Sequence, residues 1–85
     1  MIMYNILFEK SAQKNLYSLP KVEREKIFLS IQALSKNPRP NGYKKLAGRD
    51  GYRIRIGNYR VIYIIRDNVL TIVILNINHR KTIYR

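Results

Sequence analysis

Residues 51–63, GYRIRIGNYRVIY, contain the pattern that decides the fold. Apolar and basic side chains alternate on both sides of a Gly57-Asn58 pair. Strict alternation is typical of a strand, and Gly-Asn between two strands is typical of a tight hairpin turn. With these two residues as the loop, Arg55 lies directly opposite Arg60. Like charges in that position destabilise a sheet, so the pair needs a physical reason.

Ahead of this hairpin, apolar residues recur at intervals of three and four, which is the spacing of a helix face. The spacing predicts two helices, over 11–19 and 21–36. Ser11 is the expected N-cap of the first, and Pro20 separates the two. Residues 37–42, NPRPNG, are rich in turn formers and end the second helix.

Alternation predicts the remaining elements as strands, with a basic loop over 43–51 ahead of the hairpin. The predicted strands cover 4–8, 52–56, 59–66 and 69–77. A tight turn at Asp67-Asn68 would place Ile62 opposite Val73. The resulting order is β-α-α-β-β-β. It predicts an α+β fold in which an antiparallel sheet carries both N-terminal helices on one face.

This register predicts two different sheet faces. One face packs against the helices, and the other carries Arg53, Arg55 and Arg60 uncovered. The same uncovered face would expose four apolar side chains: Ile62, Ile64, Val73 and Leu75. An exposed apolar patch that adjoins a basic cluster indicates that a partner docks there.

Length and composition narrow the class of protein. The 85 residues predict one domain, over 1–85, and 17 Lys and Arg against 5 Asp and Glu give a net charge of +12. That charge predicts an anionic partner. General solubility is the alternative reason for a basic chain, but residues 1–35 carry a net charge of only +2 and residues 36–85 carry +10.

With no cysteine, neither a disulfide nor a thiolate metal site is available, and we expect no metal and no cofactor. Without a predicted signal peptide or membrane span, we expect a cytoplasmic protein.

The element order, the stretch YRIRIGNYRVIY (52–63) and the C-terminal HRKTIY (79–84) resemble the RelE-type toxins of bacterial and archaeal toxin–antitoxin systems. The resemblance covers essentially the whole chain and extends to the wider RelE/ParE superfamily. It implies an endoribonuclease that enters the A site of the 70S ribosome and cuts the mRNA codon there. It also implies a cognate small acidic antitoxin that wraps the toxin in a hetero-oligomer, with no role for a membrane.

The resemblance also implies roles for individual residues. The catalytic residues that it implies are Arg60, Arg80 and Tyr84. The residues expected to bind RNA are Arg53, Arg55, Lys44, Lys45 and Lys81. The residues expected to contact the antitoxin are Ile62, Ile64, Val73 and Leu75. The best-known members carry Lys at positions 53 and 55, where this chain has Arg. Because arginine stays protonated in proteins, neither residue can transfer a proton.

His79 is the one histidine of the chain and a candidate for acid–base catalysis, although a lone histidine beside a strand end is more often structural. Two other function classes stay open beside the ribonuclease. One is a ParE-like inhibitor of DNA gyrase on the same fold, and the other is a non-enzymatic, basic RNA-binding protein. The set Arg60, Arg80 and Tyr84 favours the ribonuclease over the gyrase inhibitor. The apolar patch favours either toxin over the RNA-binding protein.

Overall fold

The structure is a computed structural model that describes residues 3–79, which form five strands and two α-helices. The strands are β1 (Asn5–Phe8), β2 (Lys44–Lys45), β3 (Tyr52–Ile56), β4 (Tyr59–Arg66) and β5 (Thr71–His79). The helices are α1 (Lys10–Tyr17) and α2 (Lys21–Leu34), and a 3-10 turn, Asp67–Val69, precedes β5. Neither of these helices is long and apolar enough to cross a membrane.

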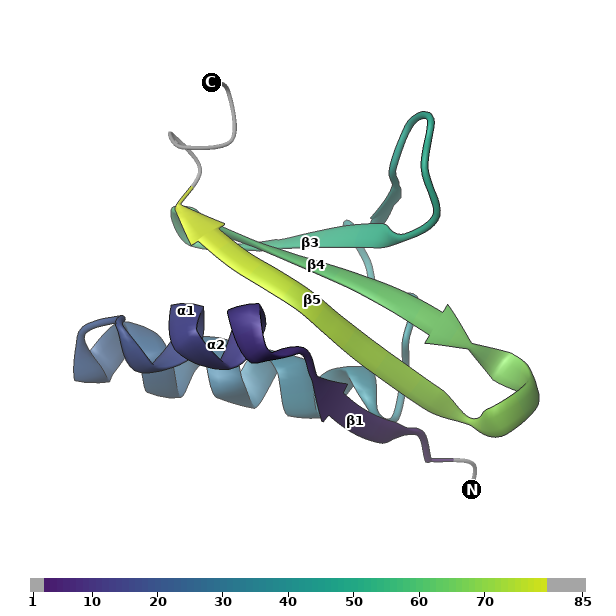
Figure 1. The fold of residues 1–85 in the computed structure, drawn as a ribbon, viewed down its shortest axis with the longest axis horizontal. Helices are drawn as coiled ribbons and strands as arrows, with labels where there is room; N and C mark the ends of the chain where they lie inside the picture. Colours follow the sequence, from purple (N-terminus) through teal and green to yellow (C-terminus); the bar gives the residue numbers. More distant parts are fainter. Residues whose placement is uncertain (1–2, 80–85) are drawn as a thin grey trace.

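The strands form one sheet in the order β1-β5-β4-β3-β2. β1 pairs with β5 in parallel, and the other three pairings are antiparallel. Both helices lie on the same face of the sheet (Figure 1). The predicted α+β architecture is therefore confirmed. The short strand β2 is an addition, because its residues were predicted to belong to a loop.

The core lies between the helices and the sheet. Its buried side chains are Ala12, Leu16, Ile27, Ile31, Leu34, Ile54, Val61, Tyr63, Ile72, Ile74 and Ile77. Five isoleucines in this set are at most 2% exposed, and each such side chain stabilises the fold by about 1.5–3 kcal/mol through burial. The face of the sheet opposite the helices is called the open face below.

The first hairpin has the predicted register. Ile54 pairs with Val61, and Arg55 pairs with Arg60. Gly57 has a φ of +59°, whereas the φ of Asn58 is not positive. This combination fits a type II′ turn, which has glycine at its first central position and matches the twist of a two-strand hairpin.

The predicted register of the second hairpin is wrong. Ile62 pairs with Asn76 rather than with Val73, and Val73 pairs with Ile64. One reason is that the connection is longer than two residues, since the 3-10 turn and Leu70 separate β4 from β5. A second reason is a bulge in β5, which shifts the register between Ile62 and its neighbour Tyr63.

Beyond the end of β1, side chains of α1 supply hydrogen-bond partners for backbone groups at the edge of β5. Ser11 was predicted to be an N-cap, but α1 begins at Lys10 with no side-chain cap, and the Ser11 hydroxyl donates to the Leu75 carbonyl at 2.9 Å. One helical turn further on, the Asn15 Oδ1 accepts the Ile77 backbone N–H at 3.0 Å. Backbone groups at a strand edge need such partners when they are removed from water. These contacts fix the second half of β5.

The turn-rich segment after α2 is fastened to the sheet. The buried Tyr63 hydroxyl donates to the Pro38 carbonyl at 2.8 Å, and burial raises the pKa of Tyr63 to about 12. Arg39 pairs with Asp67 at 2.9 Å, and the Tyr4 hydroxyl donates to the same carboxylate. The Arg39 guanidinium holds the pKa of Asp67 below its usual range. Because this ion pair is exposed, Tyr63 is the stronger anchor.

Candidate nucleic-acid interface

The three arginines of the first hairpin lie at different depths. Arg55 is exposed and Arg53 is half-buried, whereas Arg60 is only 8% exposed. Arg60 lies on the open face, which no helix covers, as expected, but it is not exposed there. Its side chain lies in a hollow that Leu46 and Ala47 also line. These two residues belong to the loop between β2 and β3, which rises from the sheet on the side away from α1 and α2 (Figure 1).

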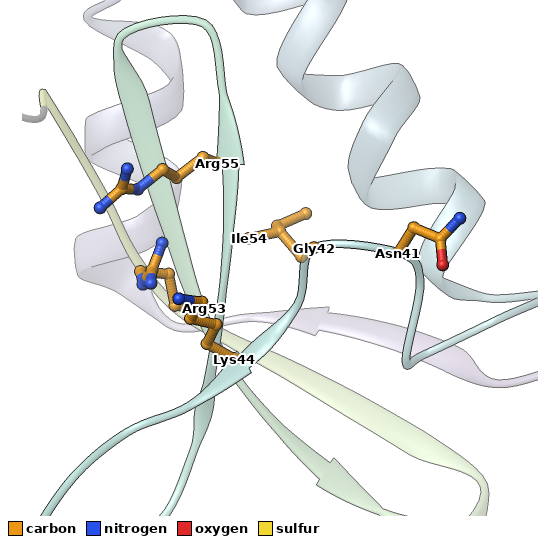
Figure 2. A pocket seen from close by; sticks show the side chains of 6 residues that line it. All are labelled: Asn41, Gly42, Lys44, Arg53, Ile54 and Arg55. Carbon is orange, nitrogen blue, oxygen red and sulfur yellow. The ribbon is translucent and has the colours of Figure 1, made fainter.

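One hollow lies along the outer edge of β3 and is called the edge hollow. It has a volume of about 310 Å³ and is lined by Asn41, Gly42, Lys44, Arg53, Ile54 and Arg55. Arg53 and Arg55 project to the same side of β3, while Ile54 points to the other side, toward Asn41 (Figure 2). Lys44 lies directly opposite Arg53 in the β2–β3 pairing. The edge hollow is therefore lined by three cationic side chains, those of Lys44, Arg53 and Arg55.

A second hollow, the open-face hollow, has a volume of about 280 Å³. It is lined by Leu46, Ala47, Arg49, Arg53, Arg60, Ile62, Asn76 and Asn78. Arg53 lines both hollows, so they adjoin through its side chain. Among the described residues, no Asp or Glu lines either hollow. Solvated strand faces usually mix signs, so a surface of one sign indicates an anionic ligand.

The sheet separates two expected RNA-binding or catalytic residues from these arginines. The His79 ring packs edge-on against Tyr59, with ring centroids 5.2 Å apart, and the two residues are paired across β4 and β5. Tyr59 packs against the core, so His79 faces the helix side. Lys45 is exposed and pairs with Tyr52, which also packs against the core. Of the two loop lysines, the structure brings only Lys44 to the arginines.

The apolar patch is smaller than the sequence predicted. Ile62 is 8% exposed and lines the open-face hollow beside Leu46, so its predicted exposure is wrong. Ile64, Val73 and Leu75 are half-buried. The first two are paired with each other across β4 and β5, which makes them the centre of the apolar surface that remains accessible.

Three expected site residues, Arg80, Lys81 and Tyr84, lie outside the described residues.

Three others that line the open-face hollow were not predicted: Arg49, Asn76 and Asn78. The position of Arg49 depends on how its loop folds, for which the sequence carries no periodic signal. The two asparagines reach the open face only because of the bulge in β5, since unbroken alternation from the buried Ile72 and Ile74 would place them on the core side. Within residues 3–79, no group of three or more His, Cys, Asp and Glu residues could hold a metal ion.

Comparison with known proteins places the chain among toxins. Residues 6–84 match the family model described as the ParE toxin of the type II toxin–antitoxin system parDE. Toxin RelG of Mycobacterium tuberculosis is 34% identical over 96% of this chain and 97% of the relative. In the crystal structure of the toxin–antitoxin complex RelBE2 from M. tuberculosis, the similar chain is 30% identical, with a TM-score of 0.85 and 94% of each chain covered. In the archaeal RelE–RelB complex from Pyrococcus horikoshii, it is 33% identical, with a TM-score of 0.82 and coverage of 93% of this chain and 97% of the other.

Proposed function

The chain belongs to the RelE/ParE family of type II toxin–antitoxin toxins, and from that premise we propose that it is a ribosome-dependent endoribonuclease. It would cut mRNA in the A site through attack by a ribose 2′-hydroxyl. The observation that carries this proposal is the pairing of Arg55 with Arg60 beside Arg53. A phosphate bound among these cations turns their mutual repulsion into attraction for the ligand.

The different depths of the arginines suit different tasks. Exposed Arg55 and half-buried Arg53 can bind backbone phosphates as the RNA arrives. Arg60 lies deeper, where a fixed positive charge acts through a medium of lower dielectric constant than water. Such a preorganised charge stabilises the extra negative charge that develops on the phosphorane oxygens in the transition state. In this proposal Arg60 is the main electrostatic catalyst.

Proton transfer needs a group other than these arginines, because arginine stays protonated. His79 faces the other side of the sheet, so the proposal assigns the proton to the Tyr84 hydroxyl. Replacing Tyr84 with Phe should slow cleavage by about 10²–10⁴-fold and leave ribosome affinity nearly unchanged. A wild-type cleavage rate in this variant would remove Tyr84 from the mechanism. An enzyme with so few proton-transferring groups would gain most of its rate from the ribosome's orientation of the mRNA.

We also propose that a cognate acidic antitoxin covers part of the open face. The support is the partly accessible Ile64–Val73 pair beside the basic hollows, together with the similar chains found in toxin–antitoxin complexes. Asp at both positions should abolish the complex, because it puts like charge against an acidic partner and removes apolar contact. Asp at exposed Val22 and Leu29 on α2 is the matched control. A complex unaffected by the Ile64 and Val73 changes would contradict this placement.

Induction of the chain in bacterial cells, followed by mapping of mRNA 5′ ends, tests the proposed activity. The expected result is new ends inside translated codons that disappear in the Arg60→Ala variant. Growth arrest with intact mRNA and accumulated gyrase–DNA breaks would favour the ParE-like alternative. Crosslinking to RNA without any cleavage would favour a binding protein. Either outcome would contradict the ribonuclease proposal.

A further inference from the structure

We propose that Asn76 and Asn78 together read the edge of one unpaired nucleobase, with adenine preferred, in the open-face hollow. The proposal deepens the proposed function, since it rests on RNA being the ligand of this face. It adds a base-specific contact to the phosphate contacts of the arginines, and it assigns this contact to two residues whose position only the structure reveals.

The bulge in β5 is the first observation. Ile72 and Ile74 are fully buried, and unbroken alternation would bury Asn76 with them. The register shift instead leaves Leu75 as the extra residue, so that Ile77 enters the core and Asn76 pairs with Ile62. Bulges commonly re-aim side chains next to functional sites. Here the bulge places two amides, at positions 76 and 78, on the same face as Arg60.

The hydrogen bond between the two amides is the second observation. The Asn78 Nδ2 donates to the Asn76 Oδ1 at 2.9 Å. An asparagine amide has two N–H donors and one carbonyl acceptor. After this bond the pair can still offer an Asn76 N–H and the Asn78 carbonyl. Exchanging the two roles leaves the same combination of one donor and one acceptor. The bond also restricts the rotation of both side chains, so the pair is preorganised.

The surroundings of the pair are the third observation. Leu46, Ala47 and Ile62 give the hollow apolar walls, against which the face of a base can pack. The positive charge that would bind the adjoining phosphate comes from Arg53 and Arg60. Arg60 is paired with Asn78 across β4 and β5. A volume of about 280 Å³ accommodates a single nucleobase. Phosphate contacts position a nucleic acid, whereas contacts to base edges provide the sequence preference.

Adenine matches the amide pair by its own donor and acceptor. Its N6 amino group donates to a carbonyl, and its neighbouring ring nitrogen accepts from an N–H, which is the pattern that asparagine recognises. A good two-bond contact of this kind discriminates against the wrong base by about 5- to 150-fold. Single-stranded RNA offers these edges because its bases are unpaired.

Equilibrium binding of short labelled RNAs to the free chain tests the proposal without a ribosome. The probes are oligouridylates in which one central nucleotide is A, C, G or U, recovered intact after the measurement. The wild type should bind the adenine probe about 5- to 150-fold more tightly than the all-uridine probe. Replacing both asparagines with the similarly shaped leucine should abolish this preference. Affinity for the all-uridine probe and its salt dependence should remain.

Leucine at Asn5, an exposed position on β1 at the far edge of the sheet, is the control and should keep the preference. Thermal melting verifies that each variant is folded. Equal binding of all four probes by the wild type would overturn the proposal, as would a preference for another base, no RNA binding, or an adenine preference in the double variant. Because the assay measures binding, a chain that fails to cut mRNA can still pass it. A chain that cuts mRNA can likewise fail it.

Discussion

Arg55 and Arg60 are paired directly across the β3–β4 hairpin, yet the first is exposed and the second is 8% exposed. Like charges therefore face each other at one place, and one of the two lies largely out of contact with water. An anion bound between them turns their mutual repulsion into attraction for the ligand. This arrangement is what we expect where stability has been given up for binding.

Replacement of Arg60 with Met should therefore stabilise the free protein. The substitution removes the charge directly opposite Arg55 and keeps much of the side chain's volume, so the gain in stability should be about 1 kcal/mol. The control is Arg66→Met, at an exposed position on the same strand, which should change stability by no more than about 0.5 kcal/mol. Urea unfolding measures both. A clear loss of stability in the Arg60 variant would mean that the charge supports the fold.

Replacement of both Arg53 and Arg55 with Ala should flatten the salt dependence of RNA binding. Each phosphate contact to a single strand contributes a slope of about −0.7 in a plot of log K against log salt, so losing two should change the slope by about 1.4. The control is Lys10→Ala with Lys14→Ala, which removes the same charge from α1 on the other face. An unchanged slope in the arginine variant would exclude these residues from the RNA path.

Replacement of Tyr63 with Phe should destabilise the protein by about 1–3 kcal/mol, because it leaves the Pro38 carbonyl without its hydrogen-bond donor in a buried position. Tyr17→Phe, on the exposed side of α1, is the control and should have almost no effect. Chemical denaturation of both variants tests the difference. Equal stability of the two variants would show that Tyr63 does not anchor the segment after α2.

Alkaline pH should weaken the fold through the same tyrosine. Burial raises the pKa of Tyr63 from 10.0 to about 12, with smaller effects from neighbouring phenols. Between these values the folded state binds more protons than the unfolded state, so stability falls as pH rises from about 10 to about 12. The difference in stability between wild type and Tyr63→Phe should shrink over this range. A difference that stays constant would contradict the shifted pKa.

Local patterns were enough to predict the elements and one of the two hairpins. The register of β3 and β4 follows from the Gly57-Asn58 turn, because a two-residue loop between alternating strands fixes every pair that follows it. The helices follow from apolar spacing in the same way. These features depend on residues close together in the sequence, so local sequence patterns are enough to predict them.

The second hairpin and much of the site depend on contacts between distant residues. The bulge in β5 lies where Ser11 and Asn15 of α1 bond to the strand edge, more than sixty positions away in the chain. No local pattern indicates it, so alternation alone assigned the wrong partners to Ile62 and missed Asn76. The burial of Arg60 likewise depends on the fold of a loop from elsewhere in the chain.

In the proposed mechanism, this chain cuts mRNA by 2′-hydroxyl attack, with Arg60 stabilising the transition state. The most direct test is single-turnover cleavage of mRNA in the ribosomal A site, with analysis of the product ends, by the wild type and by Arg60→Ala. We predict a 2′,3′-cyclic phosphate or its opened 3′-phosphate, a 5′-hydroxyl on the other product, and a rate about 10²-fold or more lower in the variant. Products with a 3′-hydroxyl and a 5′-phosphate, or equal rates for the two proteins, would contradict this mechanism.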